Sequence, residues 1–352
     1  MKEFILFPVT LQIELEEIME TLALILMVLG IFSIALHNTT QRWLLREKIL
    51  SKTETLVAQH SISILFLLSA FWWWNSWGTA FHSHTLLFWF SVMGTSIANI
   101  FIQNFNAKAK SLAEASLIAP IQAMTPGLVT VAALLIGEYP TKQGIAGIIL
   151  IGLGVYIHSR ENATTLREYL QPFQFLMLPA NFSKLPAEKQ NEAIKNRNAL
   201  RWAYASAGMG TFGLLFDGLT ARNGDIALGF GIQAIILTTT FLILYSVVRK
   251  KETASLLPLG VRLKAHLLPI LLIGIFYGFH VVFIMTSFRL APIAYIGSLK
   301  RLSIPLIIFL SWIILKEKKA VRRLWPASIV TFGALLLAFD GSMGRILDHL
   351  TP

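Results

Sequence analysis

Residues 291–339 read APIAYIGSLKRLSIPLIIFLSWIILKEKKAVRRLWPASIVTFGALLLAF. The stretch holds most of two apolar runs, 291–315 and 321–340, on either side of a short basic turn. A run of about 20 apolar residues is long enough to cross the hydrocarbon core of a bilayer as a helix. These residues therefore predict a pair of membrane-spanning helices joined by a tight, positively charged turn.

The same pattern continues over the rest of the chain, which has 352 residues, 55% of them hydrophobic and only 14% charged. In soluble proteins roughly a quarter of all residues are charged, so this composition favours a bilayer as the solvent. We predict ten spanning segments, at 21–38, 57–77, 85–106, 112–136, 143–158, 200–220, 226–248, 266–288, 291–315 and 321–340.

The polar, charge-rich segment 159–199 separates these spans into two sets of five, 21–158 and 200–340. A shift of 179 residues pairs Pro126 with Pro305 and Glu138 with Glu317, and a shift of 180 pairs Gly30 with Gly210. Duplicated halves with an odd number of spans must have opposite topologies. We therefore expect an all-α membrane protein of ten transmembrane helices, built as two inverted five-helix repeats around a polar linker with an amphipathic helix at 186–198.

The distribution of Lys and Arg predicts the orientation. Of the 30 basic residues, 23 lie in loops on one side of the predicted membrane, 5 lie on the other side, and Lys300 and Arg301 lie inside a span. The side rich in Lys and Arg is normally cytoplasmic. We expect both termini to face outward, in the bacterial cytoplasmic (inner) membrane. Because the charge of +11 is divided among short loops, it favours a bilayer partner and no nucleic acid.

Residues 111–157 and 291–339 share a start rich in small residues, a proline within the first span, a Gly-Glu or Lys-Glu before a polar turn (Glu138, Glu317), and glycines in the second span. Both resemble the repeat of the drug/metabolite transporter superfamily, in its EamA-like ten-helix branch. The resemblance implies a carrier of small metabolites and leaves the substrate open. Better-studied ten-span members resemble a plan with both termini in the cytoplasm, the reverse of the orientation that the charges predict here.

Lys300 and Arg301 are the clearest candidates for a substrate site. Each charge at the centre of a span costs about 2.5–3.5 kcal/mol, and such residues normally face a bundle interior or a water-filled cavity. Tyr295 and Ser303 are expected to line the same cavity. The pair resembles the Lys-Arg pair of the phosphate-translocator branch, which contacts the substrate phosphate, and it suits a carboxylate or phosphate group. The alternative is a structural ion pair with an acid elsewhere.

Two acidic residues are candidates for a counter-charge to this pair or for proton coupling. Glu114 lies at the start of the span 112–136, and Asp217 lies three-quarters along the span 200–220, where the 180-residue shift pairs it with His37. An interfacial position in contact with water is the alternative for both acids.

Further polar residues lie within apolar spans. Asn99 and Gln103 share one helical face by their i, i+4 spacing. Gln122 pairs with Arg301 under the 179-residue shift, and Tyr277 and His280 form an i, i+3 pair. We expect these five side chains to line the substrate cavity or to join helices. Pro126 and Pro305 are expected to bend their helices.

The sequence predicts a secondary transporter or exchanger that works by alternating access on a small organic anion or a phosphorylated metabolite, as a monomer or homodimer. An exporter of neutral amino acids or cationic drugs is the alternative within the same class. No nucleotide-binding, cofactor or metal-binding motif is present, and there is no cysteine. A membrane-embedded enzyme or a channel is the alternative of another class, and we expect no enzyme activity.

Overall fold

The computed structural model describes residues 9–74, 84–122, 124–125, 128, 141–159, 182–254, 256–290 and 300–338. Within these ranges all regular structure is helical, which confirms the predicted all-α class. The α-helices are α1 (Val9–Arg46), α2 (Lys52–Trp74), α3 (Leu86–Leu112), α4 (Ala115–Gln122), α6 (Lys142–Ser159), α8 (Ala187–Asn223), α9 (Ile226–Glu252), α10 (Leu259–Leu290), α12 (Ser303–Ile313) and α13 (Ala320–Ala338). Two short 3₁₀ helices, η3 (Phe182–Lys184) and η4 (Lys300–Leu302), accompany them.

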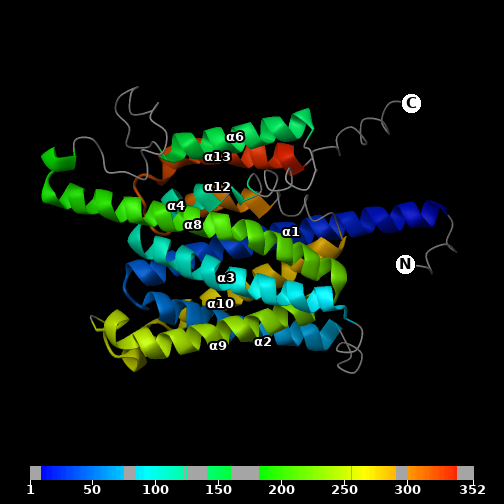
Figure 1. Cartoon of the computed structure of the whole chain (residues 1–352), viewed down its shortest axis with the longest axis horizontal. Coiled ribbons are helices and arrows are strands. Elements are labelled where there is room, and N and C mark those ends of the chain that lie inside the picture. The colour runs from blue at the N-terminus through cyan, green and yellow to red at the C-terminus, as the bar shows by residue number, and fades with distance from the viewer. Residues whose placement is uncertain are drawn as a thin grey trace.

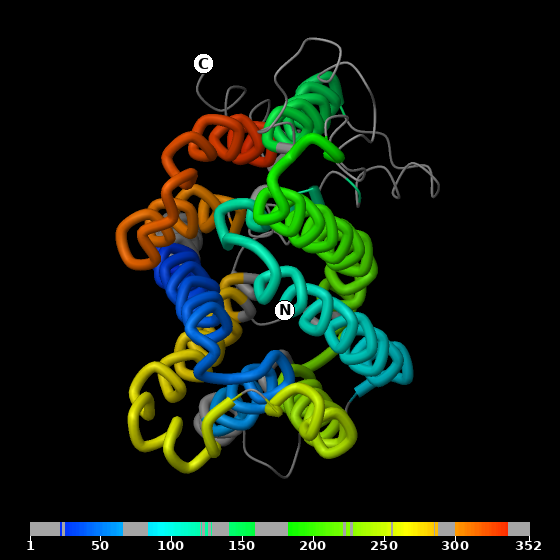
Figure 2. Tube along the Cα trace, turned by 90° about the vertical axis from the view of Figure 1, so that its left-hand side faces the viewer, coloured from blue at the N-terminus to red at the C-terminus, as the bar shows by residue number. Residues whose placement is uncertain are grey.

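The helices lie lengthwise along one direction and form a bundle (Figure 1). Helices α6 and α13 lie at one edge and α2 and α9 at the opposite edge, with the others between them (Figures 1 and 2). The closest pairs are α1 with α10, α3 with α8, α2 with α9, and α6 with α13, while α4 packs on α8 and α12. Most of these pairs join a helix before residue 160 to one after residue 186.

The surface of this bundle is apolar and much of its interior is polar. Along α3 the side chains of Leu86, Phe90, Met93, Ile97 and Phe101 are exposed at the spacing of one helical face. Buried polar side chains include Gln59, His60 and Thr95, each fully inaccessible. Three helices in the described ranges, Leu86–Leu112, Leu228–Glu252 and Leu259–Ile284, are long and apolar enough to cross a membrane. These features are typical of a membrane protein.

The structure differs from the sequence-based expectations at three places. Lys300 and Arg301 do not lie within an α-helix but on η4, and α12 begins after them at Ser303. Pro305 therefore falls in the first turn of a helix, where a missing N–H costs nothing. The segment predicted as a linker is helical from Ala187 onward, so the expected amphipathic helix is continuous with the following span in α8.

Helix α10 contains a kink that the sequence explains. His266 has non-helical dihedral angles, φ −133° and ψ 31°, and Pro269 follows three residues later. The proline ring excludes the carbonyl of the residue four positions earlier and removes one helical hydrogen bond.

Glycines allow α6 and α13 to approach closely. A Cβ atom on Gly154 would lie 2.8 Å from the backbone nitrogen of Val330 and 2.9 Å from the carbonyl oxygen of Pro326. A Cβ on Gly333 would lie 2.7 Å from the carbonyl oxygen of Gly147. Small residues that bring two backbones together are a usual basis of helix association in membranes.

Gly154→Ala is therefore expected to separate α6 from α13 and to destabilise the protein by about 1–3 kcal/mol, the usual cost of overpacking. The melting temperature of the purified protein in detergent measures the effect. Gly152→Ala is the matched control, because a Cβ there meets nothing within 4 Å. Equal melting temperatures for the two variants would contradict the close-packing role of Gly154.

Candidate functional site: a polar cavity in the bundle

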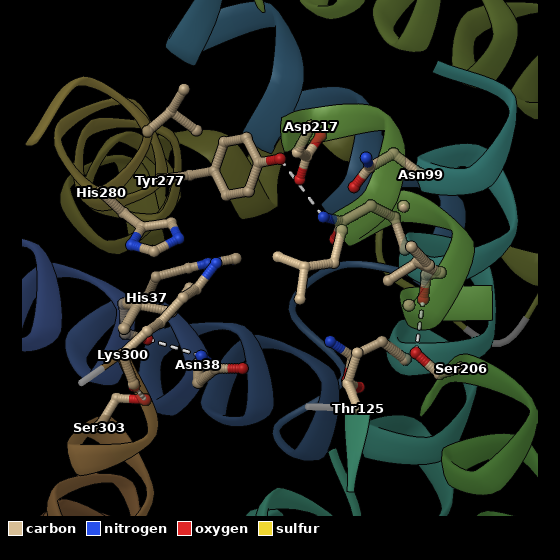
Figure 3. A pocket seen from close by; sticks show the side chains of 18 of the residues that line it. His37, Asn38, Asn99, Thr125, Ser206, Asp217, Tyr277, His280, Lys300 and Ser303 are labelled. Carbon is tan, nitrogen blue, oxygen red and sulfur yellow. Dashed lines mark hydrogen bonds between the residues drawn. The ribbon is translucent and has the colours of Figure 1, made fainter. Parts of the chain in front are cut away.

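A cavity of about 200 Å³ lies inside the bundle (Figure 3). Its walls come from α1, α3, α8, α9, α10 and α12, together with η4, Ala119 of α4, and Thr125. Polar side chains reach it from most of these elements, among them His37, Asn38, Asn99, Gln103, Asn106, Ser206, Asp217, Gln233, Tyr277, His280, Lys300, Arg301 and Ser303. Both predicted halves of the chain therefore contribute to one polar chamber.

Lys300 and Arg301 reach the cavity from η4. The hydroxyl of Ser303 donates a hydrogen bond of 2.7 Å to the carbonyl oxygen of Lys300, which holds this turn at the start of α12. Among the described residues no carboxylate oxygen lies within 4.0 Å of the Lys300 ammonium. The cavity thus contains a positive charge without a contact ion pair in the described part of the chain.

Asp217 lines the same cavity and is bound to Thr95. The Thr95 hydroxyl donates a short hydrogen bond to Asp217 Oδ1. The Thr95 hydroxyl oxygen accepts hydrogen bonds from Asn99 Nδ2 at 3.2 Å and Gln233 Nε2 at 3.4 Å. Thr95 therefore joins α3, α8 and α9 at one wall of the cavity and fixes the carboxylate there.

The charged groups are separated within the cavity. Figure 3 shows His37, His280 and Lys300 on one side and Asn99, Asp217, Thr125 and Ser206 on the other. Asp217 and Lys300 form no contact ion pair in the described part of the chain. This arrangement gives the cavity a cationic side and a side with a carboxylate, amides and hydroxyls.

Aromatic and imidazole rings form the boundary of the cavity toward α2. The Tyr277 hydroxyl accepts a hydrogen bond of 3.3 Å from Gln103 Nε2. The Tyr277 ring contacts His37 and His60 edge-on, with centroids 5.2 and 5.1 Å away. His280 Nδ1 lies 3.3 Å from the carbonyl oxygen of Gly30 on α1. Tyr277 is therefore held between the Gln103 amide on α3 and the imidazole rings of His37 on α1 and His60 on α2.

The structure places eight of the eleven residues predicted for the site around this cavity: Lys300, Arg301, Ser303, Asn99, Gln103, Tyr277, His280 and Asp217. Their binding of a substrate stays a prediction. Tyr295 lies outside the described residues, and so does the side chain of Gln122, whose backbone ends α4. The cavity is also lined by His37, Asn38, Ser206 and Gln233, which were not predicted as site residues, although the 180-residue shift pairs His37 with Asp217.

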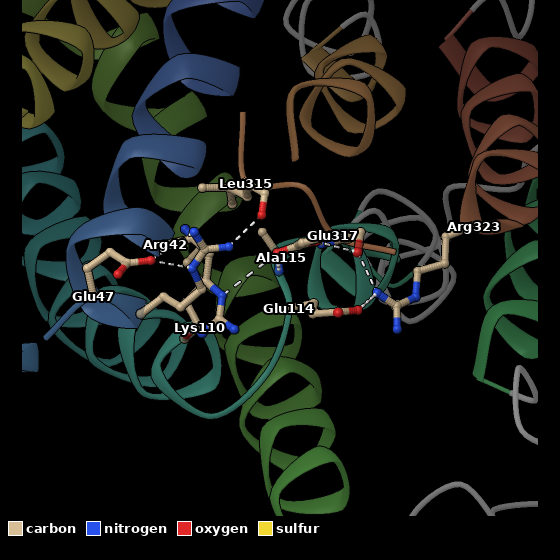
Figure 4. A network of polar contacts seen from close by, with 10 residues as sticks. Arg42, Glu47, Lys110, Glu114, Ala115, Leu315, Glu317 and Arg323 are labelled. Carbon is tan, nitrogen blue, oxygen red and sulfur yellow. Dashed lines mark hydrogen bonds and ion pairs between the residues drawn. The ribbon is translucent and has the colours of Figure 1, made fainter. Parts of the chain in front are cut away.

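Glu114 is not among the residues that line the cavity. Its carboxylate accepts a short hydrogen bond from Arg323 Nη1, 209 residues away, at the end of the bundle where α4 begins (Figure 4). The same arginine nitrogen donates to the Ser116 hydroxyl. The partner of Glu114 is thus Arg323, and neither Lys300 nor Arg301.

Glu317 is the centre of this second polar network. Its carboxylate accepts hydrogen bonds from the backbone N–H groups of Ala115, at 3.1 Å, and Ser116, at 3.3 Å, and from the Ser116 hydroxyl, at 2.7 Å. The side chain of Glu317 is only 3% exposed and lies 3.8 Å from Arg42 Nε. Glu317, from the turn between α12 and α13, therefore caps the N-terminus of α4, where a negative charge is favoured.

A series of hydrogen bonds and one ion-pair contact connect the two polar regions. Lys110 is buried and donates from Nζ to Asn38, which lines the cavity, and at 2.6 Å to Gln41. Its carbonyl oxygen accepts from Arg42, which reaches Glu317. In the other direction Gln41 bonds to Gln59 at 3.3 Å, and Gln59 to Gln103 at 3.5 Å. Side-chain amides thus run from the cavity to the network at the end of the bundle.

In the described ranges no three His, Asp or Glu side chains are grouped to hold a metal ion.

Comparison with known proteins gives a likeness of fold only. No family model and no curated protein matches the sequence. A solved structure described only as "Crystal structure of protein" superposes with a TM-score of 0.51 at 14% sequence identity, covering 91% of this chain and 96% of its own. The similarity extends over nearly the whole of both chains and concerns the arrangement of the helices.

Glu317→Ala is expected to destabilise the protein by about 3–5 kcal/mol, because it leaves the buried donors of Ala115 and Ser116 and the Arg42 guanidinium without their carboxylate. Thermal unfolding of the purified protein in detergent measures this loss. The control is Glu192→Ala, since Glu192 is 59% exposed and pairs with Lys319 at the surface, where an ion pair contributes about 1 kcal/mol or less. A Glu317 variant as stable as the Glu192 variant would show that the cap is dispensable.

Proposed function

We propose that the protein is a membrane carrier that moves a small organic anion, such as a carboxylate or a phosphorylated metabolite, by alternating access. The observation that carries the proposal is the position of Lys300 and Arg301 on a polar cavity inside a bundle with an apolar surface. A cationic residue is costly to keep among apolar helices, and it persists where it faces a ligand path or a partner. For Lys300 the described residues offer no contact carboxylate.

The packing of the helices supports an EamA-like plan of ten spans in two inverted repeats. Under that plan α8, α9, α10, α12 and α13 correspond to α1, α2, α3, α4 and α6. The observed pairs α2 with α9, α4 with α12 and α6 with α13 then each join a helix to its own counterpart. The counterpart of α1 is α8 and the counterpart of α10 is α3. The observed pair of α1 with α10 therefore has an equivalent in the observed pair of α8 with α3. A two-fold relation between the repeats produces this set of pairs.

The helix breaks also follow the proposed repeat. Helix α4 ends at Gln122, and the equivalent residue Arg301 lies on η4 just before α12 begins. In transporters with inverted repeats the substrate often binds near discontinuous helices, where free backbone groups and side chains line a cavity. The end of α4 and the start of α12 both adjoin the cavity, because Ala119 and Thr125 line it near the first and Lys300 and Ser303 near the second.

The cavity would hold the substrate between the two repeats, which rock around it to open on either side. The energy would come from an ion gradient or from exchange with a second metabolite.

One observation favours a second substrate class: Asp217 gives the same cavity a fixed carboxylate. A neutral amino acid or a cationic drug would place its amine there. Under both alternatives the protein is a carrier and not an enzyme or a channel, and substrate-dependent countertransport is the property that separates these classes.

Ligand-dependent thermal stabilisation tests the proposal. The purified protein is heated with each of a panel of carboxylates, sugar phosphates, nucleotides, amino acids and organic cations. A ligand at 100 times its Kd adds about 2.7 kcal/mol of stability. We expect an anion to stabilise the wild type and to lose this effect in the Lys300→Ala/Arg301→Ala variant.

The control is Lys250→Ala/Lys251→Ala, which removes the same two charges at the exposed end of α9 and should keep the response. Stabilisation by amino acids or cations, equal in wild type and in the Lys300/Arg301 variant, would reject the anion class. The search for contacts would then move to Asp217 and the amides of α3. A hit is followed by countertransport in proteoliposomes.

A further inference from the structure

His37 on α1 is a buried imidazole that the proposed anion site does not yet use. Its side chain lines the cavity and the residue is only 3% exposed. Neither Nδ1 nor Nε2 has a hydrogen-bond partner among the residues that the structure describes. Most buried polar side-chain atoms have at least one such partner, and an imidazole always carries at least one N–H donor. A buried donor aimed into a cavity points to a ligand that accepts from it.

His37 differs in this respect from the other histidines near Tyr277. His280 has the Gly30 carbonyl oxygen next to Nδ1, and His60 has the Gln59 amide next to Nε2. Asp217, a carboxylate in the same cavity, already accepts from Thr95. Of the two imidazoles that line the cavity, His37 is therefore the one with neither ring nitrogen hydrogen-bonded in the described residues.

The surroundings of His37 are rich in positive charge. Titratable or charged side chains reach it or the cavity that it lines from five neighbouring elements: His60 from α2, Lys110 from α3, Asp217 from α8, Tyr277 and His280 from α10, and Lys300 and Arg301 from η4. Lys110 adds a buried ammonium near this cavity, and its partners in the described ranges, Asn38 and Gln41, are neutral. An anion in the cavity supplies the missing negative charge.

We infer that the cavity takes up a proton together with its anion, and that His37 is the group that binds this proton. The inference rests on the proposed anion-carrier function. The proton comes from water, adds to a free ring nitrogen of His37 as the anion binds, and returns to water when the anion leaves. By linkage, anion binding strengthens proton binding by the same factor by which the proton strengthens anion binding. A carrier with this coupling moves a monoanion and a proton together and is driven by a pH gradient.

Sulfate is the probe that tests the coupling, because it stays fully ionised from about pH 6 to about pH 8, where an ordinary histidine titrates. Sulfate binding to the purified wild type is measured by thermal stabilisation at both ends of this range. If one proton enters with each anion, the Kd for sulfate rises by up to about tenfold for each unit of pH increase. His37→Gln is expected to bind sulfate with little dependence on pH. His266→Gln, at the kink of α10, is the matched control that keeps the full dependence.

The outcomes separate the two proposals. No sulfate binding to the wild type at either pH would remove the anion site itself, and with it the proposed function. Equal binding at both pH values in the wild type would overturn the coupling alone, and so would a pH dependence that persists in His37→Gln. A second measurement needs no variant: calorimetric titration of the wild type in two buffers with different ionisation enthalpies gives the number of protons bound with each sulfate. A value near zero at about pH 7 would overturn the inference.

Discussion

Polar side chains enclosed by apolar helices must find their partners inside the bundle, and the arrangement of this protein follows from that constraint. An unpaired polar group costs several kcal/mol in hydrocarbon, so each buried donor or acceptor fixes a neighbour. The Thr95 hydroxyl donates a hydrogen bond to Asp217 and accepts hydrogen bonds from Asn99 and Gln233. These bonds hold α3, α8 and α9 together. Glu317 does the same for the start of α4. The apolar contacts of the bundle are less selective, because lipid can replace them.

The same constraint makes an unpartnered polar group that faces a cavity informative. Where a buried polar group lacks a partner in the described residues, the molecule either carries the cost or meets it with a bound molecule. His37 is such a group, and it lines the cavity on the same side as Lys300 (Figure 3). An unpartnered imidazole and a cation around one space support the proposed site for an acceptor with negative charge.

The sequence predicted the helices well because a continuous apolar run is a local signal, and each of the ten predicted spans overlaps an α-helix. Eight predicted site residues line the cavity for a related reason, since an apolar helix leaves few places where amides and charges are tolerated. Other features depended on distant partners. Glu114 pairs with Arg323, which lies 209 residues later in the sequence, and no local sequence pattern predicts this pairing. The 3₁₀ turn at Lys300 was missed because Pro305 suits both a helix bend and a helix start.

The link between the cavity and the end of the bundle follows from these long-range partners. Asn38 borders the cavity and also accepts from Lys110, whose carbonyl oxygen holds Arg42 next to Glu317. These contacts join α1 and α3 to the start of α4. Under the proposed alternating access, an opening of the cavity toward that end would have to separate them. Two hydrogen bonds and one ion-pair contact of 3.8 Å, through Lys110 and Arg42, therefore connect the wall of the cavity to Glu317.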